Sequence, residues 1–457
     1  MNFFTSFNPT ASPSFQPRPL LEDLYSAATR AVAPGPALAL RLGDLELGSK
    51  GSRVWILALG KAAAPMAAAA VRALSARNAL PVGGLIVGPA PSAPPCSNLL
   101  YLQGDHPEPG PYSQAASDAL ADITSRVGAG DEVWVLLSGG TTSLIGAPES
   151  GLSPAELASI YSLLLGSGLD ITAMNRIRKR FSRWGGGKLA RALAPATVRV
   201  FVVSDVIGDD LASIGSGPCV PDPTTAADLH SMLEANRLWH RLPEQARRLV
   251  LSAESGQTPE TPKPGDQAFA RVTHELIASN RLALAAAAER ARELGLIPVV
   301  YDTPLSGEAS QVGADLAAQL IHNYARPSVP QPNSSAASCW IWGGETTVTL
   351  GERSPGLGGR CQELALAAAR VLAGRSPGVA LLAAGTDGRD GPTDAAGAVV
   401  DSGTWRAIAT NGRDPAHDLE THNAYSALDA AAALLRPGLT GTNVMDVVIG
   451  LCPPRGT

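Results

Sequence analysis

The chain has 457 residues, enough for two or more domains. Hydrophobic residues make up 45% of it, as in ordinary globular proteins, and the formal net charge is −5 at pH 7. Because this acidic balance opposes non-specific nucleic-acid binding, any positive charge that serves an anionic ligand must be concentrated locally.

The five cysteines are widely spaced and form no CxxC pair, which argues against a disulfide framework or a zinc site and favours a reducing compartment. The first 20 residues contain no apolar segment of signal-peptide length, and no run of about 18 apolar residues follows. We therefore expect a cytoplasmic protein that has neither a membrane nor a nucleic acid as a partner.

Residues 1–19 are rich in Ser, Pro and Phe and are expected to be disordered. Beyond them, strand-like apolar runs alternate with amphipathic helical stretches, which predicts parallel sheets covered by helices on both faces. Residues 255–267 and 326–338 are expected to be linkers. Strands are expected over Val54–Leu59, Val133–Leu137, Val200–Val203, Ile297–Tyr301, Val379–Ala383 and Val447–Leu451. Helices are expected over Ala62–Ala76, Pro154–Leu165, Arg281–Leu294 and Gln362–Leu372.

In sheets of this kind ligands lie beyond the carboxyl ends of strands, where loops meet helix N-termini. Lys61 follows the strand Val54–Leu59 and opens an Ala-rich helix. A cation in a first helical turn opposes the helix dipole at a cost of about 0.3–1 kcal/mol, which a bound anion would offset. A solvated lysine is the alternative.

A second loop follows the strand Val133–Leu137. Its two glycines let backbone N–H groups converge, and four hydroxyls add donors. The loop consists of Ser138, Gly139, Gly140, Thr141, Thr142 and Ser143. This composition predicts a phosphate-binding loop, although a tight strand-to-helix turn would use similar residues.

Residues 174–188 hold the densest positive charge in the chain. Arg176, Arg180 and Arg183 recur at helical spacing, and a Gly-Gly-Gly-Lys sequence that ends at Lys188 follows them. A solvated helix face is the ordinary explanation of a charge run. The glycines favour an anion site instead, in which Arg176 and Lys188 would contact the substrate.

Three further charged residues follow strand-like or glycine-rich segments. Asp205 comes after Val200–Val203, where a carboxylate can hold Mg²⁺. A Gly-Leu-Gly-Gly run precedes Arg360, whose planar fork suits a carboxylate or a phosphate. Asp387 follows Val379–Ala383 and is a candidate metal ligand or general base.

Several common motifs are absent from the sequence. The chain contains no GxxxxGK[ST] motif, and no GxGxxG follows a predicted strand, which weighs against an ordinary P-loop enzyme and a dinucleotide-dependent dehydrogenase. It also lacks HExxH and GxSxG.

Together, the motifs resemble those of the glycerate 2-kinase family, in the branch with a C-terminal MOFRL domain; some relatives carry a hydroxypyruvate reductase label. The resemblance runs from about residue 20 to the end of the chain. The matching stretches are LGKAA at 59–63, GDHPEPG at 104–110, LLSGGTTSL at 136–144, NRIRKRFSRWGGGKLA at 175–190, SDVIGDD at 204–210, SGPCVPDPTT at 216–225, GGETTVTL at 343–350, GGRCQELALA at 358–367, GTDGRDGPTDAAGA at 385–398 and TGTNVMD at 440–446. Ten motifs in one order are far more specific than any one of them.

The resemblance implies an α/β protein of two domains with its active site in the cleft between them. A Rossmann-like N-terminal domain, a parallel sheet with flanking helices, would cover residues 20–265, and an α/β domain that contains MOFRL would cover residues 266–457. Lys61 and Arg360 would be the central catalytic pair, and Asp387 would accept a proton.

The implied reaction is the ATP-dependent phosphorylation of glycerate to 2-phosphoglycerate by a monomer or homodimer. The loop 138–143 and Gly344 would bind ATP. Asp205 and Glu345 would hold Mg²⁺, and Arg360 would clamp the glycerate carboxylate.

Two other functions stay open. One is NAD(P)H-dependent reduction of hydroxypyruvate, which the missing dinucleotide motif opposes. The other is a non-catalytic sensor of a sugar acid or a nucleotide. The sensor hypothesis rests on Cys361, where the family usually has Asn, because a thiol is a weaker hydrogen-bonding group than an amide.

Overall fold

The computed structural model describes residues 15–45, 53–325, 336–351, 356–375 and 377–454. The chain folds into two compact units. The parallel-sheet unit contains Ala31–Asn280 and Gly441–Val444. The mixed-sheet unit contains the described parts of Met1–Arg30, Arg281–Thr440 and Met445–Thr457.

The parallel-sheet unit is built on six parallel strands in the order β3-β2-β1-β4-β5-β6. The strands are β1 (Val54–Leu59), β2 (Gly83–Gly88), β3 (Leu99–Gln103), β4 (Glu132–Leu137), β5 (Thr197–Val203) and β6 (Val272–Ala278). Its α-helices are α2 (Pro34–Gly43), α3 (Ala63–Ser75), α4 (Pro111–Ser125), α5 (Thr141–Leu144), α6 (Pro154–Leu165), α7 (Ile171–Phe181), α8 (Lys188–Leu193), α9 (Ala226–Ala235) and α10 (Glu244–Glu254). Short 3₁₀ turns lie at Ile207–Asp209, Ile214–Ser216, Trp239–Arg241 and Gln267–Phe269.

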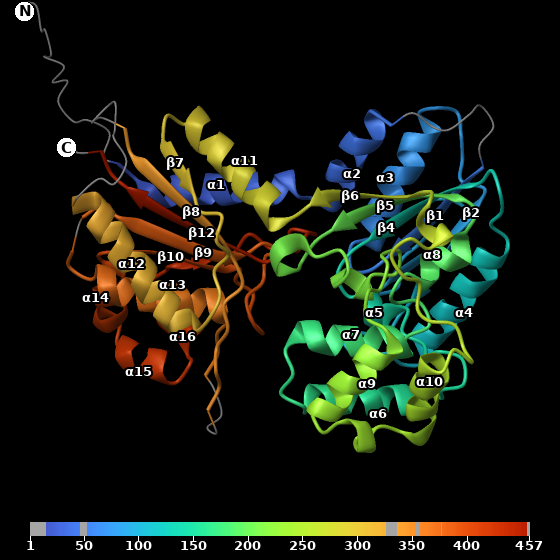
Figure 1. The fold of residues 1–457 in the computed structure, drawn as a ribbon. Helices are drawn as coiled ribbons and strands as arrows, with labels where there is room; N and C mark the ends of the chain where they lie inside the picture. Colours follow the sequence, from blue (N-terminus) through green and yellow to red (C-terminus); the bar gives the residue numbers. More distant parts are fainter. Residues whose placement is uncertain (1–14, 46–52, 326–335, 352–355, 376, 455–457) are drawn as a thin grey trace, which may run out of the picture. The chain divides into compact units, whose positions relative to one another are not determined.

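Helices cover both faces of this sheet, as the sequence predicts (Figure 1). On one face α4 and α8 pack against alternate residues of β1, β4 and β5, and α2 and α3 lie over the other face. Every residue of β1 and β4 is buried, which explains why β1 and the part of β4 after Glu132 are unbroken apolar runs. A separate apolar cluster holds α6, α7, α9 and α10 together.

The strand order places a topological switch between β1 and β4. From β1 the chain moves outward through β2 to β3, and then returns to β4 on the other side of β1. The loops after β1 and β4 therefore diverge at the carboxyl edge, which is where such sheets bind ligands. Lys61 and the loop 138–143 occupy those two positions.

The second sheet has the order β11-β10-β9-β12-β8-β7. Its strands are β7 (Ile297–Val300), β8 (Ser338–Gly344), β9 (Ala380–Gly385), β10 (Gly397–Asp401), β11 (Leu434–Leu435) and β12 (Asp446–Cys452). The helices of this unit are α1 (Pro17–Ala31), α11 (Asn280–Glu293), α12 (Ala309–Ala325), α13 (Arg360–Leu372), α14 (Thr404–Thr410), α15 (Pro415–Glu420) and α16 (Ala424–Ala430).

The expectation of parallel strands was wrong for most of this second sheet. β7 and β8 pair in parallel, whereas all the other pairings are antiparallel. The loop between β9 and β10 contains no helix, and a direct connection of this kind returns the chain antiparallel; a parallel pair needs a crossover. The helices α12 and α13 pack on one face of the sheet, and α1 and α11 lie on the other (Figure 1).

The N-terminal helix α1 belongs to the mixed-sheet unit. Tyr25 Oη donates a hydrogen bond of 2.7 Å to Gly385 O at the end of β9. Asp23 forms an ion pair of 2.7 Å with Arg290 of α11. Because α1 starts at Pro17, the expected disorder of residues 1–19 does not hold for residues 17–19, and residues 1–14 lie outside the described ones.

The structure divides the chain differently from the expected boundary at residues 265 and 266. The segment 255–267 does not separate the units, because β6 continues the parallel sheet beside β5. The unit boundary instead falls between Asn280 and Arg281, at the start of α11. Most of the second expected linker, residues 326–335, lies outside the described residues.

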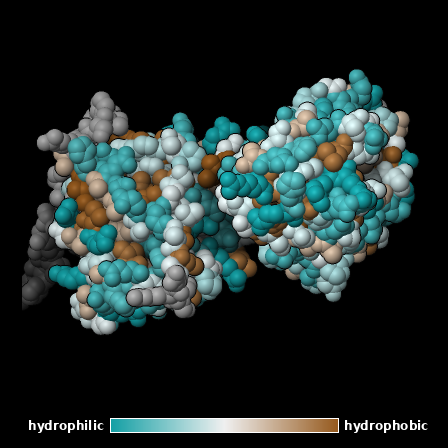
Figure 2. All heavy atoms as spheres, turned by 60° about the horizontal axis from the view of Figure 1, so that its bottom comes forward, coloured by the Kyte–Doolittle hydropathy of each residue, from teal (hydrophilic) through white to brown (hydrophobic). Residues whose placement is uncertain are grey.

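Within the described residues no helix is both long enough and apolar enough to cross a membrane. On the face drawn in Figure 2, hydrophobic residues are scattered among hydrophilic ones. The five cysteines are all free thiols, four of them buried.

Candidate functional site

The loop after β4 is locked against the loop after β1. Lys61 N donates to Gly139 O at 2.9 Å, and Ser138 Oγ accepts from Ala62 N at 3.0 Å. Glycine is required at two points of this contact. A Cβ on Gly60 would lie 2.3 Å from Ser138 Oγ, and a Cβ on Gly139 would lie 1.8 Å from Asp205 Oδ2.

Gly140 gives the loop the shape of an anion-binding nest. Its φ of 84° is left-handed, and the right-handed α5 follows directly. Successive left-handed and right-handed residues point their N–H groups into one concavity, which suits a phosphate. The sequence-predicted cradle therefore has the backbone conformation that it needs.

The hydroxyls of the loop act differently from the expectation that they add phosphate donors. Thr141 Oγ1 bonds to Leu59 O at 2.9 Å, and Ser143 Oγ donates to Gly140 O at 3.1 Å. Thr142 Oγ1 pairs with Ser216 Oγ at 2.9 Å. These side chains fix the loop, so phosphate binding would fall mainly to the backbone.

Three charged or titratable side chains surround the nest. The Lys61 side chain is exposed. Burial raises the pKa of Asp205, while its own backbone N–H and the charge of Lys61 oppose that rise. The sequence motifs gave no role to His106, yet a Cβ on Gly140 would lie 3.1 Å from its ring. Burial, and then Lys61, lower the pKa of His106.

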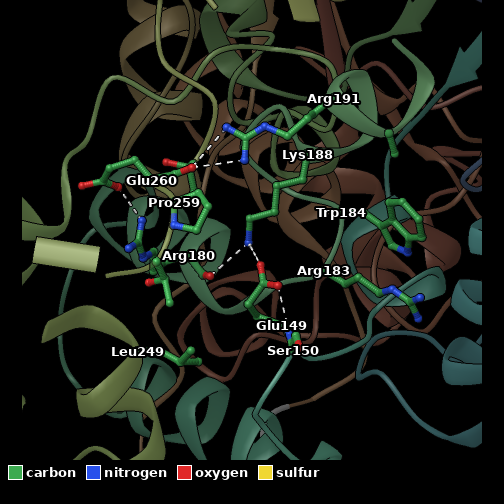
Figure 3. Close-up of a pocket in the computed structure, with 13 residues that line it drawn as sticks. Glu149, Ser150, Arg180, Arg183, Trp184, Lys188, Arg191, Leu249, Pro259 and Glu260 are labelled. Carbon is green, nitrogen blue, oxygen red and sulfur yellow. Dashed lines mark hydrogen bonds and ion pairs between the residues drawn. The ribbon is translucent and has the colours of Figure 1, made fainter. Parts of the chain in front are cut away.

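The basic run 174–188 does not form one solvated face. Arg176 is exposed, whereas Arg180 is buried in an ion pair of 2.5 Å with Glu260. Arg183 pairs with Asp118 at 2.8 Å and stacks on Trp184. A pocket of about 500 Å³ is lined by four of the nearby cations, Arg180, Arg183, Lys188 and Arg191 (Figure 3).

Lys188 lies at the centre of this pocket, and its ammonium is engaged by the protein. Lys188 Nζ donates to Glu149 and to Arg180 O at 3.1 Å (Figure 3). It also donates to Ser182 O at 2.6 Å. An ammonium has three N–H donors, so these acceptors use all of them. The expectation that Lys188 binds substrate gains no support from these contacts, which tie the end of α7 to the segment after α5.

In the mixed-sheet unit, Arg360 opens α13 and is held by two carboxylates. Arg360 Nε and Nη2 bond to Asp446 at 2.6 and 2.9 Å, and Nη1 lies 2.8 Å from Glu345. Burial alone would lower the pKa of Arg360, but the hydrogen bonds and charge of Asp446 raise it above its ordinary value. Asp446 ends the motif TGTNVMD at 440–446, but the sequence alone predicts no role for it.

Cys361 follows Arg360 directly on α13. Its side chain is buried and hydrogen-bonds with Asp446, and burial is the main reason why the pKa of the thiol is raised. The thiol therefore neighbours the carboxylate that holds Arg360 and does not face solvent.

The glycines before Arg360 allow close packing on two neighbouring segments. A Cβ on Gly359 would lie 2.3 Å from Asp390 Oδ1, and one on Gly356 would lie 2.4 Å from Asn423 Cβ. Asp390 in turn accepts from Cys361 N and Gln362 N at 3.2 and 2.7 Å. Burial raises the pKa of Asp390 to about 7.

A pocket of about 540 Å³ opens beside Arg360. Glu345, Glu363, Asp390 and His422 contribute its other titratable groups. Val348, Leu350 and Pro392 provide its apolar walls.

The two remaining predicted residues of this unit are placed as follows. Asp387 is half-buried, and its Oδ1 accepts from Arg389 N at 2.9 Å. Gly344 is buried with a φ of 141°, and a Cβ there would lie 2.4 Å from the backbone of Leu305. The glycine is thus needed for chain packing, and the expectation that it contacts a nucleotide gains no support.

The two predicted metal ligands lie in different units. Asp205 lies in the parallel-sheet unit and Glu345 in the mixed-sheet unit, where it pairs with Arg360. Among the described residues, no group of three or more His, Cys, Asp or Glu side chains is arranged to hold a metal ion.

The fold and the site define a class of two-domain α/β proteins suited to small anionic ligands. Its first sheet is doubly wound, with a lysine and a glycine nest at the switch point. Its second sheet is mixed and carries an arginine between carboxylates. Residues 20–251 match a domain of unknown function named DUF4147, and residues 338–446 match the MOFRL family. Because glycerate 2-kinases match it at 35–36% identity over 87–94% of its length, the chain belongs to the glycerate 2-kinase family.

Relatives that span most of the chain support this assignment. Identity is 36% to a glycerate 2-kinase of Pyrococcus horikoshii, with 87% of each chain covered. It is 35% to a D-glycerate 2-kinase of Thermotoga maritima, with 94% of this chain and 97% of that protein covered. It is also 35% to a putative hydroxypyruvate reductase of Agrobacterium vitis, over 94% of this chain and 93% of that protein.

The fold agrees with a solved relative. The crystal structure of a glycerate kinase from Thermotoga maritima superimposes with a TM-score of 0.85 at 35% identity and covers 95% of this chain and 99% of its own.

Proposed function

We propose that this protein transfers the γ-phosphoryl group of ATP to the 2-hydroxyl of glycerate, which yields ADP and 2-phosphoglycerate. The observation that carries the proposal is the nest at Gly140, locked beside Lys61 at the switch point. It occurs in a chain that is 35% identical to a D-glycerate 2-kinase over nearly its whole length.

The parallel-sheet unit would hold the donor. Backbone N–H groups of the loop 138–143 would bind ATP phosphates, and Lys61 would offset the charge that builds on the transferring group. Mg²⁺ would arrive with ATP. Because Mg²⁺ in such sites keeps phosphate and water ligands and needs one or two carboxylates, the half-buried Asp205 beside Gly139 fits it.

The mixed-sheet unit would hold the acceptor through Arg360. Asp446 occupies the Nε–Nη2 edge, so a glycerate carboxylate would approach the Nη1 side, where Glu345 also lies. Exposed Arg176 adds a cation on α7. In the reaction the 2-hydroxyl oxygen bonds to Pγ, the bond from Pγ to the β,γ-bridging oxygen breaks, ADP leaves with that electron pair, and the hydroxyl proton passes to a base. The sequence proposes Asp387 as this base.

ADP release with purified protein, ATP and Mg²⁺ tests the proposal, with glycerate present or omitted. We expect glycerate-dependent ADP formation and a product that is phosphorylated at the 2-position, identified by ³¹P NMR. An ADP signal that does not depend on glycerate would contradict the proposal.

Reduction of hydroxypyruvate is a second candidate, because an Agrobacterium vitis relative carries that name. Oxidation of NADH or NADPH with hydroxypyruvate, measured on the same preparation, decides between the two activities. Glycerate or ATP binding with neither turnover would support the sensor hypothesis.

We also propose that the protein works in the cytoplasm as a monomer or a homodimer. Size-exclusion chromatography with light scattering, and fractionation of cells that carry a tagged chain, test these two statements.

A further inference from the structure

The pocket beside Arg360 contains an imidazole held by a buried carboxylate. Glu363 Oε2 lies 2.8 Å from His422 Nδ1, and the Glu363 side chain is only 4% exposed. Glu363 follows Arg360 by three positions on α13, so both side chains share one face of the helix and line the same pocket.

The same glycine run that delivers Arg360 also fixes the turn that carries His422. Gly356 N donates to Thr421 O at 2.9 Å, and a Cβ on Gly358 would lie 3.4 Å from His422 O. His422 itself has a left-handed φ of 54° between α15 and α16. A non-glycine residue held in this region is uncommon, and such residues often occur at functional sites.

The Glu363 contact determines which ring nitrogen of His422 can react. With Glu363 ionised, Nδ1 carries the hydrogen and donates it, so Nε2 on the far side of the ring keeps its lone pair. A carboxylate that orients an imidazole in this way also stabilises the imidazolium that forms when Nε2 takes a proton. Burial raises the pKa of Glu363, and His422 opposes that rise.

Other charges act on this pair from several elements. Glu308 adds negative charge near Glu363. Arg413, just before α15, forms an ion pair with Asp418 on α15, the helix that precedes His422. The pocket itself adds Arg360, Glu345 and Asp390. Among these neighbours the four carboxyl groups outnumber the two guanidinium groups.

We propose that His422, oriented by Glu363, is the catalytic base that takes the proton of the acceptor hydroxyl, in place of Asp387. This inference rests on the proposed kinase function. His422 Nε2 accepts the proton while the hydroxyl oxygen bonds to Pγ, and the imidazolium releases the proton to solvent after the product leaves. Asp387 is the weaker candidate, because its Oδ1 is already held by Arg389 N.

The test is the pH dependence of glycerate-dependent ADP release between about pH 5 and pH 9, measured on the full chain. The variants are His422→Asn, Glu363→Gln and Asp387→Asn, with His417→Asn as the control. His417 lies on α15, five residues before His422, outside the residues that line the pocket.

We expect His422→Asn to lower kcat by roughly 10²-fold or more, with a much smaller change in KM, and to remove the rising limb of the pH–activity profile. Glu363→Gln should move that limb to lower pH, because it removes the charge that favours imidazolium. Asp387→Asn and His417→Asn should leave the limb in place.

Three results would overturn the inference. His422→Asn could raise KM alone with an unchanged limb, which would make His422 a binding residue. Loss of the limb in Asp387→Asn alone would return the role to Asp387. If the rising limb of the pH–activity profile stays at the same pH in Glu363→Gln, Glu363 does not act on the catalytic base. This variant tests the inference even if His422→Asn does not fold. Absence of glycerate-dependent turnover in the unmodified protein is a different outcome, which ends the proposed function itself.

Discussion

Asp446 accepts two hydrogen bonds from Arg360, with Nε–Oδ2 and Nη2–Oδ1 distances of 2.6 and 2.9 Å. The first residue of β12 thereby sets the direction of the first side chain of α13. Only 6% of the Asp446 side chain is exposed, so this ion pair places one of its two charged groups in the interior.

Asp446→Asn should therefore destabilise the fold. We expect a loss of about 1–3 kcal/mol in the free energy of unfolding, below the range for a fully buried pair because Arg360 is 35% exposed. Urea unfolding followed by circular dichroism measures it. Asp429→Asn is the control, since Asp429 pairs with Arg436 at the surface and is 53% exposed. Equal effects of both substitutions would contradict the prediction.

Arg360→Lys should leave the protein folded and cause a marked loss of kcat/KM for glycerate. An ammonium cannot make the two parallel bonds to Asp446 and also face a ligand, as a guanidinium can. Steady-state kinetics with varied glycerate measure the loss. The same change at the exposed Arg436 should have little effect, and comparable losses at both positions would argue against a role for the fork.

Lys61→Ala should remove most turnover, by roughly 10²–10³-fold in kcat, because a cation aimed at a transferring phosphoryl group acts mainly in the transition state. Since the Lys61 side chain is exposed, the melting temperature should hardly change. Arg72→Ala, at an exposed position of α3, is the matched control. Near-normal activity of Lys61→Ala would end the assigned role.

Gly139→Ala should damage both stability and activity. A Cβ there would lie 1.8 Å from Asp205 Oδ2, so either the Asp205 side chain or the loops after β4 and β5 must shift. We expect a cost of about 1–3 kcal/mol and a loss of ATP affinity, measured by urea unfolding and by calorimetric titration with MgATP. Gly128→Ala meets nothing within 4 Å and should be neutral or mildly stabilising. Normal nucleotide binding by Gly139→Ala would contradict the proposed cradle.

Asp390 should make stability depend on pH. Because burial raises its pKa to about 7, the folded state holds a proton that the unfolded state releases near pH 4. The stability of the native protein relative to Asp390→Asn should therefore fall as pH rises from about 4 to 7, by roughly a few kcal/mol at most. Chemical unfolding at several pH values measures this difference. A difference that stays constant or increases with pH would show that Asp390 is ionised in the folded protein.

The sequence alone predicted the local elements well where the pattern was strong. Val54–Leu59 and Pro154–Leu165 are reproduced residue for residue as β1 and α6, because a fully buried parallel strand and a well-capped helix have unambiguous patterns. It also predicted a phosphate-binding loop at 138–143, because two glycines and four hydroxyls follow a strand there, although a tight strand-to-helix turn uses similar residues. The family followed from the order of the motifs along the chain.

Other features depend on contacts between residues that are distant in the sequence. Pattern alone could not reveal that most of the second sheet is antiparallel, that α1 joins the mixed-sheet unit, or that Lys188 is enclosed by Glu149 and two carbonyls. His422 and Asp446 carry no local signal. His422 is identified by its contact with Glu363, 59 residues away, and Asp446 by its contact with Arg360, 86 residues away. Local periodicity reports burial and helix or strand preference, whereas the partner of a charged group is chosen only when the chain packs and removes water from around it.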